Sequence, residues 1–364
     1  MGEIRSTEIR SMTGVRGAAA LFVMVYHFEL DRIPSDGAFS TFLNHGYLSV
    51  DLFFILSGFV MAHVYGPSFL SGAFRFGDFL WHRIARIYPL YLAVTLAFIV
   101  LAFVKTFQLD IGPDVFVSNV LMLQALGNWP SIDPPAWSVS AEVIAYLLFP
   151  VIGLLCLKSS RMTAALLGLG AILSILILTL AASRHYIGSS IAQGLLDLFA
   201  APFTVIRCLA GFTLGQLVWR VHNNSAAASF ASRTSVQICV AVLAILTLTF
   251  HDSDFPAYLL IISLIFCLST DRGMFSGFFA SRPLHFLGDI SFAVYLTHYR
   301  AISVWSMVEA RLGNAGFAVR NLVATVVTSM VVIGVSWLLH VAIERPCRQL
   351  MRKGGATLVR KPVV

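Results

Sequence analysis

The sequence predicts an all-α protein, a polytopic transmembrane helical bundle of about ten spans with the N- and C-termini in the cytoplasm. Of its 364 residues, 58% are hydrophobic and only 12% are charged, and the mean hydropathy is +0.82. This is more apolar surface than a soluble domain can bury. The apolar residues also gather in runs of about 20, the length at which a helix crosses a hydrocarbon core of about 30 Å.

Ten apolar runs are expected to form the spans, and they leave no room for a soluble domain of normal size. The runs cover residues 13–30, 47–65, 88–107, 136–157, 162–182, 201–219, 235–250, 255–270, 287–308 and 321–342. Residues 114–128 are amphipathic rather than apolar, which favours an interfacial or re-entrant segment. We therefore expect one integral membrane domain over residues 1–350 and a basic cytoplasmic tail over residues 351–364.

The basic residues indicate the orientation, because short cytoplasmic loops hold most of the Lys and Arg in a membrane protein. With the N-terminus inside, 18 of the 25 basic residues fall on the cytoplasmic side and five outside. Two remain within spans, Arg207, which is expected to be structural, and Arg300. The asymmetry accounts for the net charge of +7 with membrane lipid as the counter-charge, so no nucleic acid partner is expected.

The first span carries two ionisable groups. Arg16 and His27 are eleven residues apart, which brings them within about 20° of one helix face and separates them by roughly 16 Å along the axis. Charges and imidazoles inside a membrane are costly and usually face a polar cavity. We expect such a cavity, with the cation near one membrane surface and the imidazole well inside.

Asp51, at the start of the second span, is expected at the depth of His27 because the first two spans run antiparallel. A carboxylate beside an imidazole fixes its tautomer and raises its basicity, which suits a general base. A structural hydrogen bond between the two groups, or a helix cap by Asp51, is an equally good interpretation. Gly58, on nearly the same face, is small enough to let another helix approach closely.

A pair of guanidiniums precedes the third span. Arg83 and Arg86 are three residues apart, so they share a helix face on the expected cytoplasmic side. Planar groups that stay ionised suit phosphate oxygens. Ordinary anchoring at the lipid headgroups, together with Trp81 and Tyr88, explains these residues as well.

The fourth and ninth spans hold further polar groups. Ser138 and Glu142 are four residues apart on one helix face, and Trp137 lies at the outer interface. Glu142 has no basic neighbour in the sequence, so it needs a partner from another helix, a bound substrate or a proton. The ninth span, which includes Tyr295 and His298, is too polar to face lipid. His298 is more consistent with packing or substrate contact than with a second base.

Several reaction classes are not expected. The sequence contains no P-loop glycine pattern, no GxSxG elbow, no HExxH motif and no paired CxxC motif. These absences disfavour nucleotide hydrolysis and metal-dependent hydrolysis. The five cysteines have no spacing typical of a metal site or a disulfide framework, so no metal is expected.

Six motifs in order resemble acyltransferase family 3. They are Arg16 followed by His27, VDLFFILSGF at 50–59, RIARIYP at 83–89, WSVSAE at 137–142, SFAVYLTH at 291–298 and ERP at 344–346. Their order and spacing match from about residue 10 to residue 350. The resemblance implies a ten-span enzyme of the bacterial inner membrane. Such an enzyme moves an acyl group, often acetyl, from cytoplasmic acyl-coenzyme A to a hydroxyl, commonly of a cell-envelope or exported carbohydrate.

Residues and resemblance together predict one site. Arg16, Arg83 and Arg86 are expected to bind the phosphates of acyl-coenzyme A (acetyl-coenzyme A by default). The expected catalytic residues are His27, Asp51 and Glu142, with His27 as a general base or as the carrier of a covalent acyl group. The expected acceptor-binding residues are Trp137, Ser138, Tyr295 and His298. The competing interpretation is a proton-coupled small-molecule or glycan transporter, which the absence of a convincing internal repeat disfavours.

Overall fold

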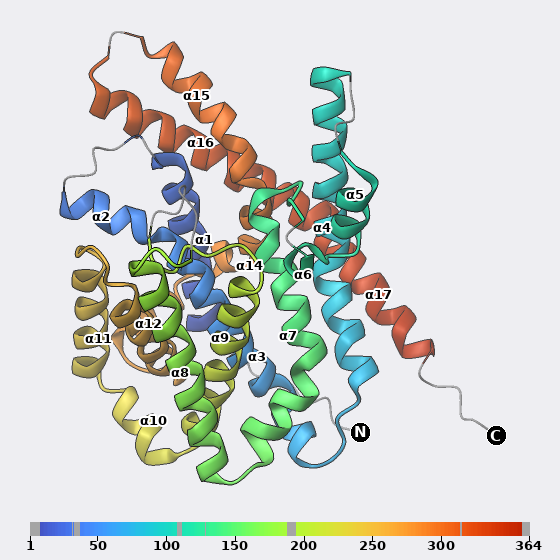
Figure 1. Cartoon of the computed structure of the whole chain (residues 1–364), viewed down its shortest axis with the longest axis vertical. Helices are drawn as coiled ribbons and strands as arrows, with labels where there is room; N and C mark the ends of the chain where they lie inside the picture. The colour runs from blue at the N-terminus through green and yellow to red at the C-terminus, as the bar shows by residue number, and fades with distance from the viewer. Residues whose placement is uncertain are drawn as a thin grey trace. The chain divides into compact units, whose positions relative to one another are not determined.

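The computed structural model describes residues 8–30, 32, 37–107, 111–127, 129–187, 194–313 and 315–358 (Figure 1). These residues contain helices and connecting segments but no β-strand, which confirms the predicted all-α class. Their contacts divide the chain into two units, which share the helices α7 (Trp137–Gly153) and α14 (Arg282–Thr297).

The first unit comprises Met1–Phe74, Leu148–Phe199 and Phe203–Asp289. Besides its parts of α7 and α14, it holds α1 (Arg10–Glu29), α2 (Ala38–Asn44), the 3-10 turn His45–Leu48, α3 (Ser49–Leu70), α8 (Arg161–Ser183), α9 (Phe203–His222), α10 (Ser225–Ala231), α11 (Thr234–Thr247), α12 (Asp254–Ser269) and α13 (Met274–Phe279).

The second unit comprises Arg75–Leu147, Ala200–Pro202 and Ile290–Val364. Besides its parts of α7 and α14, it holds α4 (Phe76–Thr106), α5 (Pro113–Val120), α6 (Gln124–Gly127), α15 (Ile302–Arg311), α16 (Phe317–Leu339) and α17 (Arg345–Leu358). A π-helical turn, His340–Glu344, joins α16 to α17.

Five helical segments among the described residues are long and apolar enough to cross a membrane. They are Ala38–Leu70, Phe76–Val104, Pro134–Lys158, Arg161–Ser183 and Phe317–Arg352. A sixth arises if α10 and α11, which meet at 63°, count as one broken span. A helix is present at each of the ten predicted positions. The chain is therefore a helical protein with several apolar helices that can span a membrane, and the count of ten stays a prediction.

Two predicted boundaries are wrong. Helix α4 begins at Phe76, not near residue 88, because Asp78 complements the positive end of its first turn and Pro89 is accommodated inside the helix. The expected span 287–308 is broken after Thr297. The break coincides with His298, whose ring Nδ1 bonds to the carbonyl oxygen of Tyr295 at 2.8 Å and so competes with regular helix bonding.

Helices α3 and α9 of the first unit pack closely against each other, and two glycines permit this contact. A Cβ atom added to Gly58 of α3 would lie 2.0 Å from the carbonyl oxygen of Phe212. A Cβ atom added to Gly215 of α9 would lie 1.9 Å from the carbonyl oxygen of Ile55. The backbones of α3 and α9 therefore contact each other directly, as the small size of Gly58 predicted.

This contact gives a first prediction. Gly58→Ala should lower the free energy of unfolding by about 1–3 kcal/mol because the two backbones must separate. Gly170→Ala in α8, where an added Cβ has no neighbour within 4 Å, is the matched control and should leave Tm unchanged or slightly raised. Thermal unfolding of the purified proteins in detergent measures both, and equal Tm values would contradict the prediction.

Candidate active site

The predicted site residues fall into two sets, one in each unit. Arg16, His27 and Asp51 belong to the first unit. The second unit contains the remaining residues, Arg83, Arg86, Trp137, Ser138, Glu142, Tyr295 and His298.

His27 is oriented by its own helix. Its ring Nδ1 lies 2.8 Å from the carbonyl oxygen of Val23, one turn earlier in α1. A carbonyl oxygen only accepts, so Nδ1 carries the hydrogen and Nε2 is the basic nitrogen of the neutral ring. The ring also meets Tyr26 edge-on, with centroids 4.7 Å apart. This tautomer presents one defined nitrogen that can take a proton.

Asp51 has a different partner from the one expected. The side chain of Arg207 in α9 donates from Nε to Oδ1 at 2.7 Å and from Nη2 to Oδ2 at 2.6 Å. Both side chains are fully buried. The structure thus corrects the predicted orientation of His27 by Asp51, because a bidentate guanidinium binds a carboxylate more strongly than a neutral imidazole does. Arg207 has the structural role predicted for it.

A second buried carboxylate, which sequence reasoning missed, lies near this pair. Asp254 at the start of α12 accepts hydrogen bonds from the Tyr47 hydroxyl at 2.7 Å and from the Leu196 amide at 2.6 Å. The ring of Tyr47 in turn meets Tyr26 edge-on at 6.0 Å. These contacts link α12 to the turn of α1 that carries His27. The position of Asp254, directly before an apolar run, was the signal available in the sequence.

Arg16 contacts the start of α14 in the first unit. Its Nη2 donates to the carbonyl oxygen of Gly288 at 2.7 Å, and its Nε donates to the same oxygen at 3.3 Å. Gly17 allows this close contact, because a Cβ atom added to it would lie 2.6 Å from the Gly288 nitrogen. The guanidinium expected to bind a donor phosphate is therefore held in place by backbone.

Three potential metal ligands gather near the start of α1. The ligand atoms of Glu8, His285 and Asp289 all lie within 4.8 Å of one another. His285 Nε2 is 3.0 Å from Glu8, and its Nδ1 is 3.5 Å from Asp289. Burial by itself would raise the pKa of Glu8, but hydrogen bonds from Thr13 and His285 lower it overall. Both ring nitrogens of His285 therefore already lie near carboxylate oxygens.

In the second unit the structure brings together two of the residues expected at the acceptor site. The hydroxyls of Ser138 in α7 and Tyr295 in α14 are 2.7 Å apart, and both lie within 3.1 Å of the carbonyl oxygen of Pro135. His298 is fully buried, with its ring 5.7 Å from that of Tyr295. This burial agrees with the packing role considered for His298.

Glu142 finds its partner on its own helix. The hydroxyl of Tyr146, one turn further along α7, donates to Glu142 Oε1 at 2.5 Å. This hydroxyl gives Glu142 one partner on its own helix, and the expected group from another helix, substrate or proton stays a prediction. The side chain is half-buried, so it retains a surface on which a ligand can bind.

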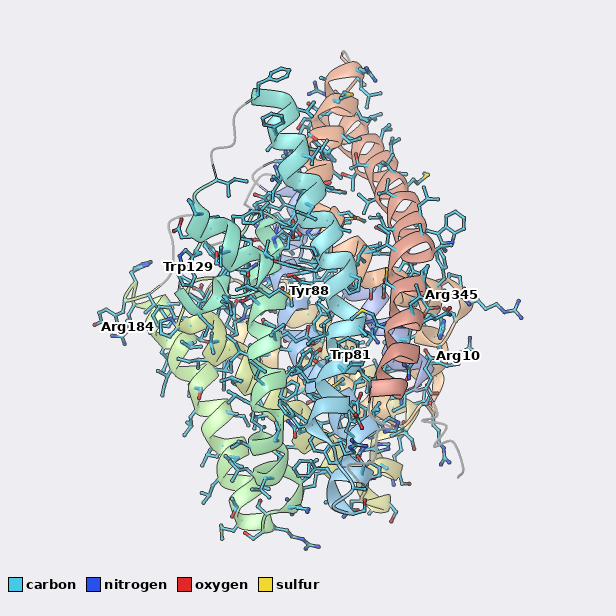
Figure 2. The ribbon with its side chains drawn as sticks, turned by 90° about the vertical axis from the view of Figure 1, so that its right-hand side faces the viewer. Arg10, Trp81, Tyr88, Trp129, Arg184 and Arg345 are labelled. Atoms are coloured by element: carbon cyan, nitrogen blue, oxygen red, sulfur yellow. The ribbon has the colours of Figure 1, made fainter. Side chains whose placement is uncertain are left out.

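Arg83 and Arg86 are half-buried on one face of α4. This part of α4 packs against α17, and the indole nitrogen of Trp81 donates to the backbone oxygen of Met351 at 2.9 Å. Figure 2 shows Trp81 and Tyr88 along α4, and Arg345 at the start of α17. Trp81 therefore joins two helices instead of serving only as an anchor to lipid. The adjacent guanidiniums stand on a fixed helix, and their donors fit phosphate oxygens.

Residues 9–341 match the family model described as an acyltransferase domain, and the chain belongs to acyltransferase family 3. The acyltransferase MdmB of Streptomyces mycarofaciens is 27% identical over 99% of this chain and 95% of its own. The putative peptidoglycan O-acetyltransferase YrhL of Bacillus subtilis (strain 168) is 24% identical over 93% of this chain and 55% of its own. The family match confirms the resemblance seen in the sequence.

The peptidoglycan O-acetyltransferase OatA of Listeria monocytogenes serovar 1/2a is 24% identical over 87% of this chain and 53% of its own length. The chain thus spans about half the length of the two peptidoglycan O-acetyltransferases. No solved structure matches this chain.

The buried pair of Asp51 and Arg207 gives a second prediction. Asp51→Leu leaves an unpaired guanidinium in the core and should destabilise the protein by about 3–5 kcal/mol. The double variant Asp51→Leu with Arg207→Met should recover most of this loss, because two apolar residues can replace a buried ion pair. Thermal unfolding in detergent measures all three proteins. A single variant as stable as the unaltered chain, or no recovery in the double variant, would count against the pair.

Proposed function

We propose that this protein is a membrane O-acyltransferase that moves an acyl group, acetyl in the first instance, from acyl-coenzyme A to a hydroxyl of a cell-envelope or exported carbohydrate. Membership of acyltransferase family 3 and the similarity to two peptidoglycan O-acetyltransferases support the reaction class. The observation that carries the proposal is the fixed tautomer of His27, because it supplies one basic nitrogen within an apolar helix.

His27 serves as the general base in this proposal. Its Nε2 takes the proton of the acceptor hydroxyl while the hydroxyl oxygen attacks the thioester carbonyl. The carbon–sulfur bond then breaks, and the coenzyme A thiolate leaves and receives the proton from the imidazolium. The bond from Nδ1 to Val23 keeps the ring in the required orientation throughout.

The donor is assigned to the arginines. Arg83 and Arg86 bind phosphate oxygens of coenzyme A, which suits two half-buried guanidiniums on one helix face. Arg16, at the start of α1, is assigned to the donor phosphates as well. Its axial distance from His27, roughly 16 Å, is comparable with the extended pantetheine arm, so the nucleotide and the thioester can occupy opposite ends of α1.

The acceptor is assigned to the polar residues of α7 and α14. Glu142 can accept hydrogen bonds from sugar hydroxyls, and the indole of Trp137 offers a face on which a sugar ring can stack. The Ser138 and Tyr295 hydroxyls add one donor and acceptor pair, and His298 packs behind them. In this proposal the chain crosses the bacterial inner membrane about ten times, with both termini in the cytoplasm.

The third prediction concerns the base. His27→Ala should lower the rate of acyl transfer by about 100- to 10,000-fold, the usual contribution of a general base, while membrane insertion is unchanged. Transfer of radiolabelled acetyl groups from acetyl-coenzyme A to envelope glycans measures the rate. His185→Ala, which alters an exposed histidine after α8, is the control and should retain full activity. Retained activity in His27→Ala would remove the proposed base.

The fourth prediction concerns the donor. Arg83→Ala should weaken binding of acetyl-coenzyme A by about tenfold or more, because one charge-assisted phosphate contact is lost. The control is Arg75→Ala. Arg75 is an exposed residue directly before α4 and pairs with Asp78 in the first turn of that helix. Titration calorimetry on purified protein measures the affinities, and release of free thiol on addition of an acceptor separates an acyltransferase from a transporter. An unchanged affinity in Arg83→Ala would argue against the phosphate role.

A further inference from the structure

The second unit contains a buried polar network that the proposed reaction does not use. Its members are Tyr91 in α4, Asn119 in α5, Gln124 in α6 and Asp133 in the segment before α7. Their exposed fractions are 1%, 0%, 2% and 1%. All four polar side chains are therefore buried, and each of their polar atoms requires a partner.

Hydrogen bonds join the first three side chains and lead to the residue before the fourth, Asp133. The Tyr91 hydroxyl donates to the backbone oxygen of Asn119 at 2.6 Å and accepts from Gln124 Nε2 at 3.0 Å. The side-chain oxygen of Asn119 accepts from Gln124 Nε2 at 3.4 Å and from the amide of Ile132 at 2.9 Å. Asn119 therefore joins Gln124 to the residue directly before Asp133.

The network has a surplus of acceptors. Its side-chain donors on Tyr91, Asn119 and Gln124 all reach an oxygen. Three acceptor atoms have no hydrogen-bond partner among the residues that the structure describes, namely Oδ1 and Oδ2 of Asp133 and Oε1 of Gln124. What completes such a network must be a cation or a donor of hydrogen bonds, and it must serve more than one oxygen.

Arg300 does not supply the missing partner. Its Nη2 donates to the backbone oxygen of Ile132 at 3.0 Å, and its guanidinium lies 4.9 Å from the ring centre of Phe98. Its charge acts on Asp133 from a distance without a hydrogen bond. The carboxyl of Asp133 is therefore buried without a bonded counter-charge among the described residues.

A single proton on the Asp133 carboxyl does not give all three acceptor oxygens a partner. Burial raises the pKa of the Asp133 carboxyl well above its ordinary value, although the charge of Arg300 opposes the effect. One added proton supplies one donor, so at least one of the three oxygens stays without a partner. A cation held by both the Asp133 carboxylate and Gln124 Oε1 would satisfy all three oxygens. Oxygen-only ligands select hard cations, and a single carboxylate charge is balanced by a monovalent one.

We propose that Asp133 and Gln124 form a binding site for a monovalent hard cation of the sodium class, with Asp133 as its charged ligand and Gln124 Oε1 as its neutral one. The bound ion ties the segment before α7 to α6. This segment also carries Pro135, whose oxygen contacts Ser138 and Tyr295. The site is independent of the proposed acyl transfer.

Thermal unfolding in sodium chloride or in choline chloride at equal ionic strength tests this proposal. In choline chloride, the raised pKa of Asp133 means that its carboxyl holds a proton in the folded state that it releases in the unfolded state. Tm should therefore fall as the pH rises above about 4. Sodium should reverse this fall and raise Tm by about 2–4 °C at pH 8, in a saturable way. A Tm that is the same in both salts at pH 8 would overturn the site.

Two variants locate the ion. Asp133→Asn replaces the charged carboxylate by an amide with two N–H donors, so the variant should fold. Its Tm should not respond to sodium and should lack the pH dependence that the Asp133 carboxyl causes. Asp114→Asn removes an exposed carboxylate at the start of α5 and should keep the full sodium response. A sodium response that persists in Asp133→Asn would place the ion elsewhere and contradict the proposal. Loss of acyl transfer with an intact sodium response would bear only on the proposed function.

Discussion

The first unit depends on the ion pair between Asp51 and Arg207. Neither side chain reaches solvent, and each can remain charged only because the other is bonded to it through two short hydrogen bonds. The pair fixes α3 against α9 at the same contact where Gly58 and Gly215 bring the backbones together. The polar contacts of Tyr47 with Asp254 extend this fixed region to α12 and to the turn of α1 that carries His27.

The same constraint shapes the residues assigned to chemistry. A polar group among apolar helices needs a partner before any substrate arrives, and several of these groups find one close by in the sequence. The His27 ring is hydrogen-bonded to the carbonyl oxygen of Val23, and Glu142 accepts from the hydroxyl of Tyr146. The Ser138 hydroxyl donates to the carbonyl oxygen of Pro135. Such bonds orient the side chains in advance, so little reorganisation is needed when charge develops during a reaction.

Asp133 differs from these buried polar groups. The buried carboxylates of Asp51 and Asp254 accept hydrogen bonds, whereas neither oxygen of Asp133 has a donor among the described residues. Its neighbours Asn119 and Gln124 have used their own donors on other oxygens. The need of buried polar groups for partners, which pairs Asp51 with Arg207, is the physical reason for the cation proposed at Asp133.

The sequence by itself determined the helical class, the presence of a helix at each predicted apolar run and the family, because these depend on composition, on run length and on motifs that are read locally. It also indicated that Gly58 allows close helix approach. Tertiary structure alone decided that Asp51 bonds to Arg207 and not to His27, since 156 positions separate the two charged residues and only the packing of α3 on α9 brings them together. It likewise decided that Ser138 contacts Tyr295 and that no described residue donates a hydrogen bond to Asp133. The pairing of buried polar groups depends on which helices touch, and a linear pattern does not record those contacts.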